Sequence, residues 1–241
     1  MGTRPVDFDN TLDEENQTHV ADLPFDRIRT SYDLVAERYA AELSDEIVAK
    51  PTERGMLLAF AELVRARGPG LVGDVACGPG HIAAHLTGLG LRVVGYDISA
   101  AMIAQAQAKF PVGMYQVGSM FHLPAGNAEW RGAVARHAML HCSPDERIRV
   151  LRELARVIEP DGYLLYGFYI SAPGQPEGSV FHLGSWFGFN VDLDIHFVGI
   201  EEAYDELERC GFVVEAAMVR EPMMKGELPT RRCYLFGRRA A

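Results

Sequence analysis

Apolar positions recur along this chain in two alternating patterns, and their alternation predicts an α/β fold. Short apolar runs with the length of buried strands occur at 71–75, 91–97, 112–117, 132–138 and 163–170. Apolar residues with the three-to-four spacing of a helix face occur at 25–43, 52–67, 144–158 and 201–210, and again after the loops near 80 and 99. Strands that alternate with helices in this way favour a mostly parallel sheet with helices packed on it.

Three further stretches depart from this alternation. Residues 212–219 and 232–237 read as two strands joined by a proline-containing turn, which predicts a terminal antiparallel pair. Residues 170–199 are rich in glycine and aromatic residues, which predicts a cap over a pocket for a flat organic molecule; a second small core under a long loop is the alternative. Residues 1–24 are acidic and aperiodic, so we expect a flexible tail or a lid ahead of a single domain at 25–241.

The loop after the run at 71–75 carries the most specific chemistry. Its glycines, Gly78 and Gly80, flank a proline, and apolar helical spacing resumes directly afterwards. A strand, a glycine turn and a helix bring unpaired backbone N–H groups and the positive end of a helix beside a bound ligand. Asp74 stands at the end of the buried run, where a carboxylate is costly unless a cation or a hydrogen-bond donor meets it.

The spacing Asp74-x-Ala76-x-Gly78-x-Gly80 resembles motif I of the class I S-adenosylmethionine-dependent methyltransferases. The string YDLVAERY at 32–39 is similar to the N-terminal helix of many small-molecule members, and the turn at 159–162 is similar to another family turn. The resemblance implies a Rossmann-like, doubly wound, seven-stranded sheet with a C-terminal antiparallel strand pair and a small cap insertion. It also implies S-adenosyl-L-methionine as the cofactor and S-adenosyl-L-homocysteine as its product.

The resemblance further implies which residues bind this cofactor. Asp97, at the end of the second strand, takes the position that accepts the ribose hydroxyls, whereas Ser119 stands where many relatives have an aspartate at the adenine. Carried over residue by residue, the expected cofactor-binding set is Tyr32, Tyr39, Asp74, Ala76, Gly78, Gly80, Asp97, Ile98, Met102, Ser119 and Met120.

The acceptor is expected at the same edge of the sheet. His137 and His141 follow the fourth strand, where a histidine can orient an acceptor or take its proton. The aromatic ring of Tyr39 would support the sulfonium cation. We therefore predict His137, His141 and Tyr39 as catalytic residues, and a substrate-binding set of Tyr169, His182, Trp186 and His196. Methyl transfer is mainly a positioning task, so we expect no metal.

Composition narrows the functional classes. The formal net charge is −10, from 33 acidic and 23 basic residues, which argues against a nucleic-acid partner. No run of 18 apolar residues is present, so no membrane span is expected. Four scattered cysteines and a polar N-terminus predict a reduced, cytoplasmic protein. The oligomeric state does not follow from the sequence.

Two alternatives compete with a methyltransferase of small molecules. The residues from Gly78 to Ala83 also fit the G-x-G-x-x-A fingerprint of dinucleotide-binding domains, and Asp97 lies near the position of their ribose-binding acid. That fingerprint gives no reason for a carboxylate at Asp74. The second alternative keeps the methyltransferase fold and the cofactor but transfers no methyl group. The favoured prediction is transfer to an oxygen or nitrogen atom of a small aromatic or heterocyclic metabolite.

Overall fold

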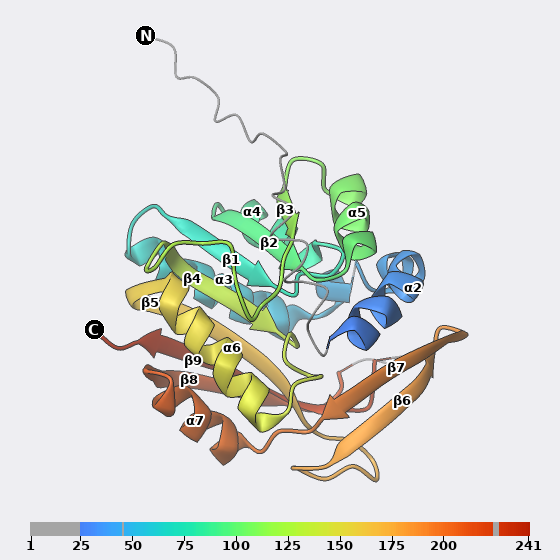
Figure 1. The fold of residues 1–241 in the computed structure, drawn as a ribbon. Helices are drawn as coiled ribbons and strands as arrows, with labels where there is room; N and C mark the ends of the chain where they lie inside the picture. Colours follow the sequence, from blue (N-terminus) through green and yellow to red (C-terminus); the bar gives the residue numbers. More distant parts are fainter. Residues whose placement is uncertain (1–24, 45, 224–226) are drawn as a thin grey trace.

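A seven-stranded sheet forms the centre of the molecule (Figure 1). The structure, a computed structural model, describes residues 25–44, 46–223 and 227–241, so the tail or lid expected at 1–24 lies outside the described residues. The strands are β1 (Leu71–Val75), β2 (Arg92–Asp97), β3 (Met114–Val117), β4 (Trp130–Arg136), β5 (Ile158–Ser171), β8 (Phe212–Arg220) and β9 (Arg231–Arg239). The helices are α2 (Asp26–Leu43), α3 (Pro51–Ala66), α4 (His81–Gly88), α5 (Ala100–Lys109), α6 (Pro144–Val157) and α7 (Ile200–Arg209), with a short 3₁₀ helix η1 (Glu46–Ala49).

The order of the strands confirms the predicted fold class. It runs β3-β2-β1-β4-β5-β9-β8, and the neighbours from β3 to β5 are parallel. Strand β9 is antiparallel to both of its neighbours and lies between β5 and β8. The expected terminal antiparallel pair is therefore present, and it completes the sheet beside β5.

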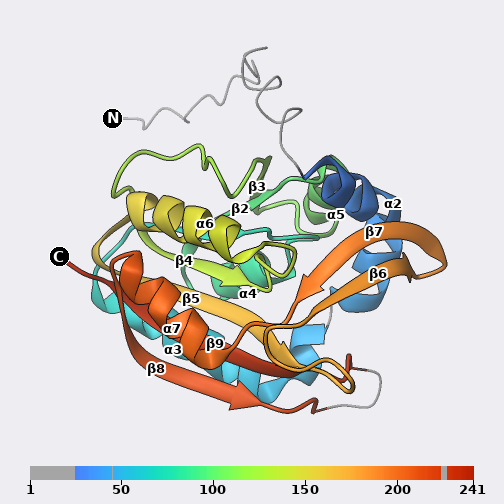
Figure 2. The ribbon, with the colours of Figure 1, turned by 60° about the horizontal axis from the view of Figure 1, so that its bottom comes forward.

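Helices cover both faces of the sheet, because successive residues of its central strands point to opposite sides. On β5, Leu164 packs into the core under α6 and α7, while Leu165 packs into the core under α3 and α4. Figure 2 shows α6 and α7 together on one face, with α3 behind the strands. Both leucines are fully buried, as expected for strands covered on two sides.

Two predicted helix starts are confirmed by their caps. The Ser99 hydroxyl accepts a hydrogen bond from the Met102 N–H at 3.0 Å, which caps α5. At the start of α6, Ser143 and Glu146 form a capping box, and Pro144 takes the first helical position. Both caps fix where a loop from the carboxyl edge of the sheet becomes a helix.

The aromatic insertion folds as a hairpin outside the main sheet. Strands β6 (Val180–Trp186) and β7 (Phe189–His196) pair antiparallel, and the hairpin lies beside α2 (Figures 1 and 2). Its two-residue turn is Phe187-Gly188, and both residues have positive φ (53° and 85°). Positive φ at both central residues is the geometry of a type I′ turn, which Phe rarely adopts.

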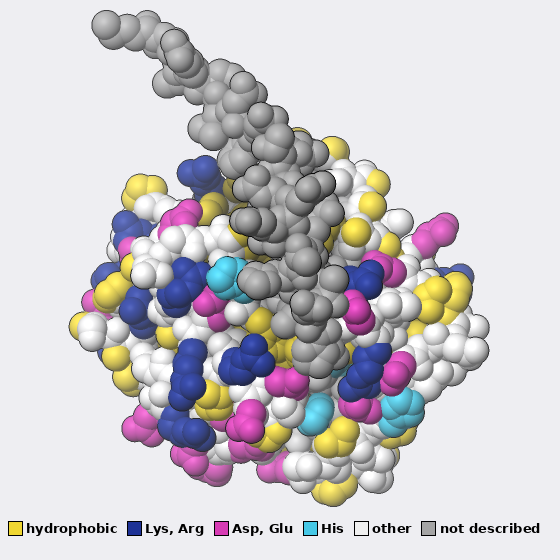
Figure 3. Space-filling model, viewed as in Figure 1, with side chains coloured by type: hydrophobic (Ala, Val, Ile, Leu, Met, Phe, Trp, Pro, Cys, Tyr) yellow, Lys and Arg dark blue, Asp and Glu magenta, His cyan; other side chains and the backbone are white. Residues whose placement is uncertain are grey.

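Charges of both signs are mixed over the surface. On the face viewed in Figure 3, Lys and Arg side chains alternate with Asp and Glu side chains over the described part of the molecule. Within the described ranges, the structure contains no helix that is long and apolar enough to cross a bilayer. The chain therefore presents a mixed polar surface on this face.

Candidate functional site

The loop between β1 and α4 leaves a bare stretch of backbone at the carboxyl edge of the sheet. Gly78 has a φ of +54°, and a Cβ added there would meet no described atom within 4 Å. Gly80 differs, because its Cβ would lie 2.6 Å from the ring of Tyr115. Gly78 therefore keeps a space open for a ligand, whereas Gly80 allows close packing of the loop. Ala76 also has a positive φ (54°), so the loop holds a sparsely populated conformation here.

Asp74 is buried beside this loop. Its Oδ2 finds no hydrogen-bond partner among the described residues. Burial raises the pKa of Asp74 to about 7, against the opposing effect of a hydrogen bond from the Ala83 main-chain N–H. A ligand that brings a cationic group to this carboxylate would relieve the cost of burying it.

Asp97 holds the loop in place. Its Oδ2 accepts a hydrogen bond from the Gly78 N–H at 2.8 Å, and its Oδ1 accepts one from the Ser99 N–H at 2.9 Å. Burial raises the pKa of Asp97 to about 6. Each carboxylate oxygen retains a lone pair, so a ligand hydroxyl can still donate to it. Together, Asp74, Gly78 and Asp97 fit a ligand that carries both a cation and hydroxyl groups.

Helix α2 is bonded to the loop after β2 and to the start of α5 through Asp33, a residue that the sequence analysis missed. Its Oδ1 accepts hydrogen bonds from the Ser99 hydroxyl at 2.6 Å and from the Ala101 N–H at 3.3 Å. Asp33 follows Tyr32 in the YD pair of the helix motif, which was the available signal. The bond fixes α2 against the start of α5.

An aromatic cluster joins α2 to the hairpin. The ring centroid of Trp186 lies 6.0 Å from that of Tyr32 and 5.3 Å from that of Tyr39, both edge-on. The rings of Tyr32 and Tyr39 are 6.3 Å apart, and Phe187 stacks on Trp186 at 5.0 Å. Edge-on and stacked pairs at these distances are favourable contacts. The structure thus brings together three of the predicted residues: Tyr32, Tyr39 and Trp186.

His141 lies against the same cluster and has a defined tautomer. Its Nδ1 lies 2.7 Å from the main-chain oxygen of Asp194 on β7, so Nδ1 carries the proton and donates it. Its Nε2 lies 2.8 Å from the hydroxyl of Tyr32, which therefore donates to it. Burial lowers the pKa of His141 to about 4, and burial also raises the pKa of Tyr32. Both side chains are neutral at pH 7.

His137, predicted for the same role, lies elsewhere. Its φ is +59°, and its ring packs 4.7 Å from Tyr169 and 5.8 Å from Tyr234. Its Nε2 has no hydrogen-bond partner in the described part of the chain, and burial holds its pKa well below the ordinary value. The guanidinium of Arg232 lies 5.3 Å from the ring of Tyr169. The structure therefore pairs His137 with Tyr169, and it does not place His137 in contact with Tyr32.

The other predicted residues differ in how closely they join the site. Met102 is 1% exposed within the main core, and the Ser119 hydroxyl accepts a hydrogen bond from the Phe121 N–H at 3.3 Å. The main-chain N–H of His196 donates to the main-chain oxygen of Leu140.

The side chain of His182 is 60% exposed and bonds to the Asp194 carboxylate at 3.0 Å. Ile98 and Met120 pack at the edge of the main core.

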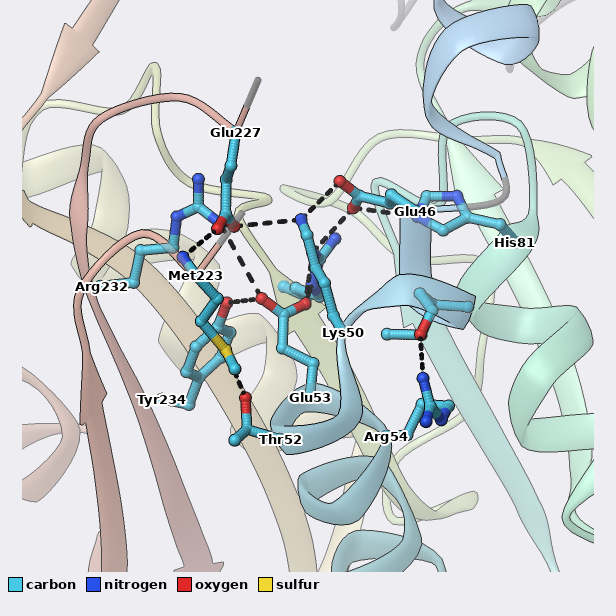
Figure 4. A network of polar contacts seen from close by, with 12 residues as sticks. Glu46, Lys50, Thr52, Glu53, Arg54, His81, Met223, Glu227, Arg232 and Tyr234 are labelled. Carbon is cyan, nitrogen blue, oxygen red and sulfur yellow. Dashed lines mark hydrogen bonds and ion pairs between the residues drawn. The ribbon is translucent and has the colours of Figure 1, made fainter. Parts of the chain in front are cut away.

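A buried ionic cluster, also missed by the sequence analysis, supports the end of β4 (Figure 4). It comprises Glu46, Lys50, Glu53, Arg136, Arg220, Glu227 and Arg232. Arg136, the last residue of β4, lies 2.8 Å from Glu46 and 2.6 Å from Glu53. Burial alone would raise the pKa of Glu53, but Arg136 and Lys50 hold it below its ordinary value.

This cluster connects β4, the strand that precedes His137, to the N-terminal helix α3 and to the C-terminal strands β8 and β9. Glu53 on α3 also contacts Arg220 of β8 and accepts a hydrogen bond from Tyr234 of β9 at 2.7 Å. Nε2 of His81, the first residue of α4, lies 3.6 Å from Glu46. An arginine within the apolar run predicted at 132–138 was the one sequence signal of the cluster. Its ion pairs join the end of β4 to α3 through Glu53, and Glu53 in turn to β8 through Arg220.

Comparison with known proteins agrees with this geometry. A family model described as a methyltransferase domain matches residues 72–162. The chain is 36% identical over 93 residues to a malonyl-[acyl-carrier protein] O-methyltransferase of Erwinia billingiae, which covers 39% of this chain and 36% of that protein. It is 27% identical over 179 residues to a demethylmenaquinone methyltransferase of Beutenbergia cavernae, which covers 73% of this chain and 72% of that protein. The chain thus spans about a third of the length of the first relative.

A solved structure extends the comparison to the fold. The 1,6-didemethyltoxoflavin-N1-methyltransferase of Burkholderia thailandensis, solved with 1,6-didemethyltoxoflavin and S-adenosylhomocysteine bound, superposes with a TM-score of 0.58 at 17% identity. The match covers 86% of this chain and 91% of that one. The chain has the class I methyltransferase fold. The fold that the sequence resemblance implied is confirmed, and the antiparallel β9 argues against a dinucleotide-binding domain, whose sheet continues with parallel strands.

Proposed function

We propose that this methyltransferase-fold chain transfers a methyl group from S-adenosyl-L-methionine to an oxygen or nitrogen atom of a small molecule. The observation that carries the proposal is the buried Asp74 carboxylate, whose Oδ2 is unpaired among the described residues, beside the open backbone of Gly78. A donor with a cationic amino group and ribose hydroxyls matches Asp74 and Asp97 in turn. The family match and the strand order support this assignment.

The acceptor, in this proposal, is a flat aromatic or heterocyclic metabolite. Tyr32, Tyr39 and Trp186 pack edge-on against one another where α2 meets the hairpin, and a cluster of aromatic side chains suits a planar ligand. The Burkholderia neighbour is named for methylation of a nitrogen atom of 1,6-didemethyltoxoflavin, which supports a nitrogen acceptor. The names of the two relatives point to an acyl carrier conjugate and a quinone precursor, so the relatives differ in acceptor.

The donor, when bound, supplies a methyl group that is already activated for displacement. The chain must therefore hold the acceptor in line and take up its proton. In the proposed path the acceptor donates its proton to the Tyr32 oxygen, while the Tyr32 proton moves to Nε2 of His141. Burial disfavours the imidazolium, but the site loses the positive charge of the donor as the methyl group leaves. The net charge of the site then stays constant through the transfer.

The remaining expectations are part of the same proposal. The described cysteines, Cys77, Cys142, Cys210 and Cys233, are all buried as free thiols, which fits a reducing compartment such as the cytoplasm. The acidic charge balance and the mixed surface of Figure 3 favour a small-molecule acceptor over a nucleic acid.

Calorimetry with S-adenosylmethionine and S-adenosylhomocysteine tests the proposal directly. We expect saturable binding of both, and release of S-adenosylhomocysteine with at least one member of a panel of phenols and N-heterocycles. Absence of binding by the folded protein would overturn the proposal. Tight binding without turnover on any acceptor would instead favour the non-transferring alternative.

A further inference from the structure

Strand β7 of the hairpin reaches into the site with its main chain. The Asp194 carbonyl accepts a hydrogen bond from Nδ1 of His141 at 2.7 Å. This contact decides which nitrogen of His141 keeps a lone pair. The strand belongs to a two-stranded hairpin outside the main sheet. The position of the carbonyl therefore depends on what holds the hairpin against the rest of the fold.

Arg27, near the start of α2, binds the hairpin at this point. Its Nη2 lies 2.6 Å from the Asp194 carboxylate, and its Nη1 lies 2.9 Å from the Asp192 carboxylate. Both acceptors point to the same side of β7, because residues two apart on a strand share a face. One planar guanidinium therefore spans the two carboxylates, a geometry that a lysine cannot reproduce.

A second contact from the same turn of α2 strengthens the attachment. The Ser31 hydroxyl accepts a hydrogen bond from the Asp192 N–H at 2.9 Å and donates one to the Arg27 carbonyl at 2.7 Å. Farther along, the hairpin is joined to the rest of the chain by hydrogen bonds from the His196 N–H to Leu140 and from the Val198 N–H to Tyr169. Arg27 and Ser31 thus bind β7 at Asp192 and Asp194, the residue whose carbonyl meets His141.

We propose that Arg27 is a positioning residue for His141. By pairing with Asp192 and Asp194, it keeps the Asp194 carbonyl on Nδ1 of His141, so that Nε2 remains the nitrogen that faces the Tyr32 hydroxyl. The relevance of this arrangement to methyl transfer rests on the proposed function, in which His141 receives a proton through Tyr32. The arrangement itself is a property of the protein without ligand.

The charged and titratable groups around His141 set the expected response. Tyr32 and Arg27 face it from α2, and Asp194 and His196 face it from β7. Burial lowers the pKa of His141 most strongly, the Asp194 hydrogen bond opposes this, and His196 and Arg27 lower the pKa further. Removing Arg27 takes away one positive charge that lowers the pKa of His141. It also loosens β7, which shields His141 from water. Both effects raise the pKa of His141 toward its ordinary value.

Nitrogen and carbon NMR of the histidine rings in the full-length protein tests the proposal without substrate. The His141 signals are assigned by their loss in His141→Gln. For the wild type we expect a single neutral Nδ1–H tautomer that does not titrate between pH 5.5 and 8. For Arg27→Ala we expect mixed tautomers and a titration midpoint raised by at least one pH unit. Arg27→Lys should fall in between. Asp194→Asn should also mix the tautomers, but without the rise in the titration midpoint, because it removes a negative charge that raises the pKa of His141.

Arg38→Ala is the matched control, because Arg38 lies on the same helix in an exposed ion pair with Glu42. It should leave the His141 signals unchanged. Unchanged tautomer and titration in a folded Arg27→Ala protein would overturn the proposal. If Arg27→Ala fails to fold, an unchanged tautomer in Asp194→Asn would overturn it. S-adenosylhomocysteine binding, measured in parallel, separates the proposed function from the positioning role of Arg27. Absence of binding in the wild type would overturn the proposed function, and the NMR result would still decide the role of Arg27.

Discussion

The hydroxyl of Tyr32 lies 2.8 Å from Nε2 of His141, although 109 positions separate the two residues in the sequence. The bond joins the first described helix to the loop after β4. Because Nδ1 of His141 is bonded to β7, this imidazole is held by two elements that lie outside the sheet. Its orientation therefore reports whether both of them are in place.

Tyr32→Phe removes the hydroxyl and leaves a buried ring nitrogen without its donor. We expect a loss of about 1–3 kcal/mol in the free energy of unfolding, the usual cost of an unsatisfied buried polar group. We also expect kcat to fall by about 10²–10⁴-fold if proton transfer passes through this oxygen. Urea denaturation and steady-state kinetics measure the two effects. A folded Tyr32→Phe protein with wild-type kcat would remove Tyr32 from the proton path.

Asp74→Asn should change stability and binding in opposite directions. In the folded chain the pKa of Asp74 is raised by burial to about 7, from an ordinary value of 3.8. Between these pH values the unfolded chain releases the proton first, so this group lowers stability as the pH rises from about 4 to 7. Asparagine removes that penalty. We expect a higher Tm at pH 8, by roughly 2–4 °C for each kcal/mol recovered, and weaker S-adenosylhomocysteine binding.

The same carboxyl group predicts a pH dependence of donor binding in the wild type. A cationic amino group is attracted to ionised Asp74 and not to its protonated form, so the affinity should rise with pH up to about 7 and then level off. Below pH 7 the affinity for the donor should change by at most about tenfold per pH unit. Calorimetry from pH 5.5 to 8 measures it, with Asp74→Asn as the control. Its affinity should level off near pH 6, where Asp97 ionises, and not near pH 7. A flat wild-type profile would contradict direct pairing of Asp74 with the donor.

Gly78→Val should block the donor site. The side chain would project into the space that no described atom fills, and the positive φ adds backbone strain. We expect S-adenosylhomocysteine binding to weaken at least a hundredfold while circular dichroism stays native-like. Gly88→Ala, at the far end of α4 and with free space at its Cβ, is the matched control and should bind normally. Equal affinities for the two variants would place the donor elsewhere.

Arg136→Met should destabilise the fold strongly. It leaves Glu46 and Glu53 buried beside one fewer cation, and breaking such a pair costs about 3–5 kcal/mol. Adding Glu53→Gln should recover part of the loss, because it removes one of the uncompensated charges. Arg38→Ala, which breaks an exposed pair, should stay within about 0.5 kcal/mol of the wild type. Denaturant titrations compare all three; a small effect of Arg136→Met would show that the cluster adds little stability.

The features that the sequence predicted well depend on local chemistry. The helix after the loop near 99, the helix at 144–158 and the glycine turn at Gly78 each follow from residues only a few positions apart. The hairpin was missed as a pair of strands because Phe187-Gly188 replaces the Asn-Gly or Asp-Gly that usually marks a type I′ turn. In this rare backbone conformation, the ring of Phe187 stacks on that of Trp186.

The contacts that the sequence did not predict join distant segments through charge. Arg27 meets β7 at separations of 165 and 167 residues, and Glu53 meets Arg220 across 167. Charged residues on helices usually face solvent, and neither period nor spacing separates those few that become buried. The surroundings of His137 were equally hidden, because no local sequence signal indicates its positive φ or its packing against Tyr169.

Helix α2 is bonded to the donor side through Asp33 and Ser99, and to the acceptor side through Arg27 and Tyr32. A displacement of α2 that breaks its bonds on one side must also strain or break its bonds on the other side. In the proposed function the donor and acceptor sites therefore share helix α2 as a wall, so that occupancy of one site changes the free energy of binding at the other.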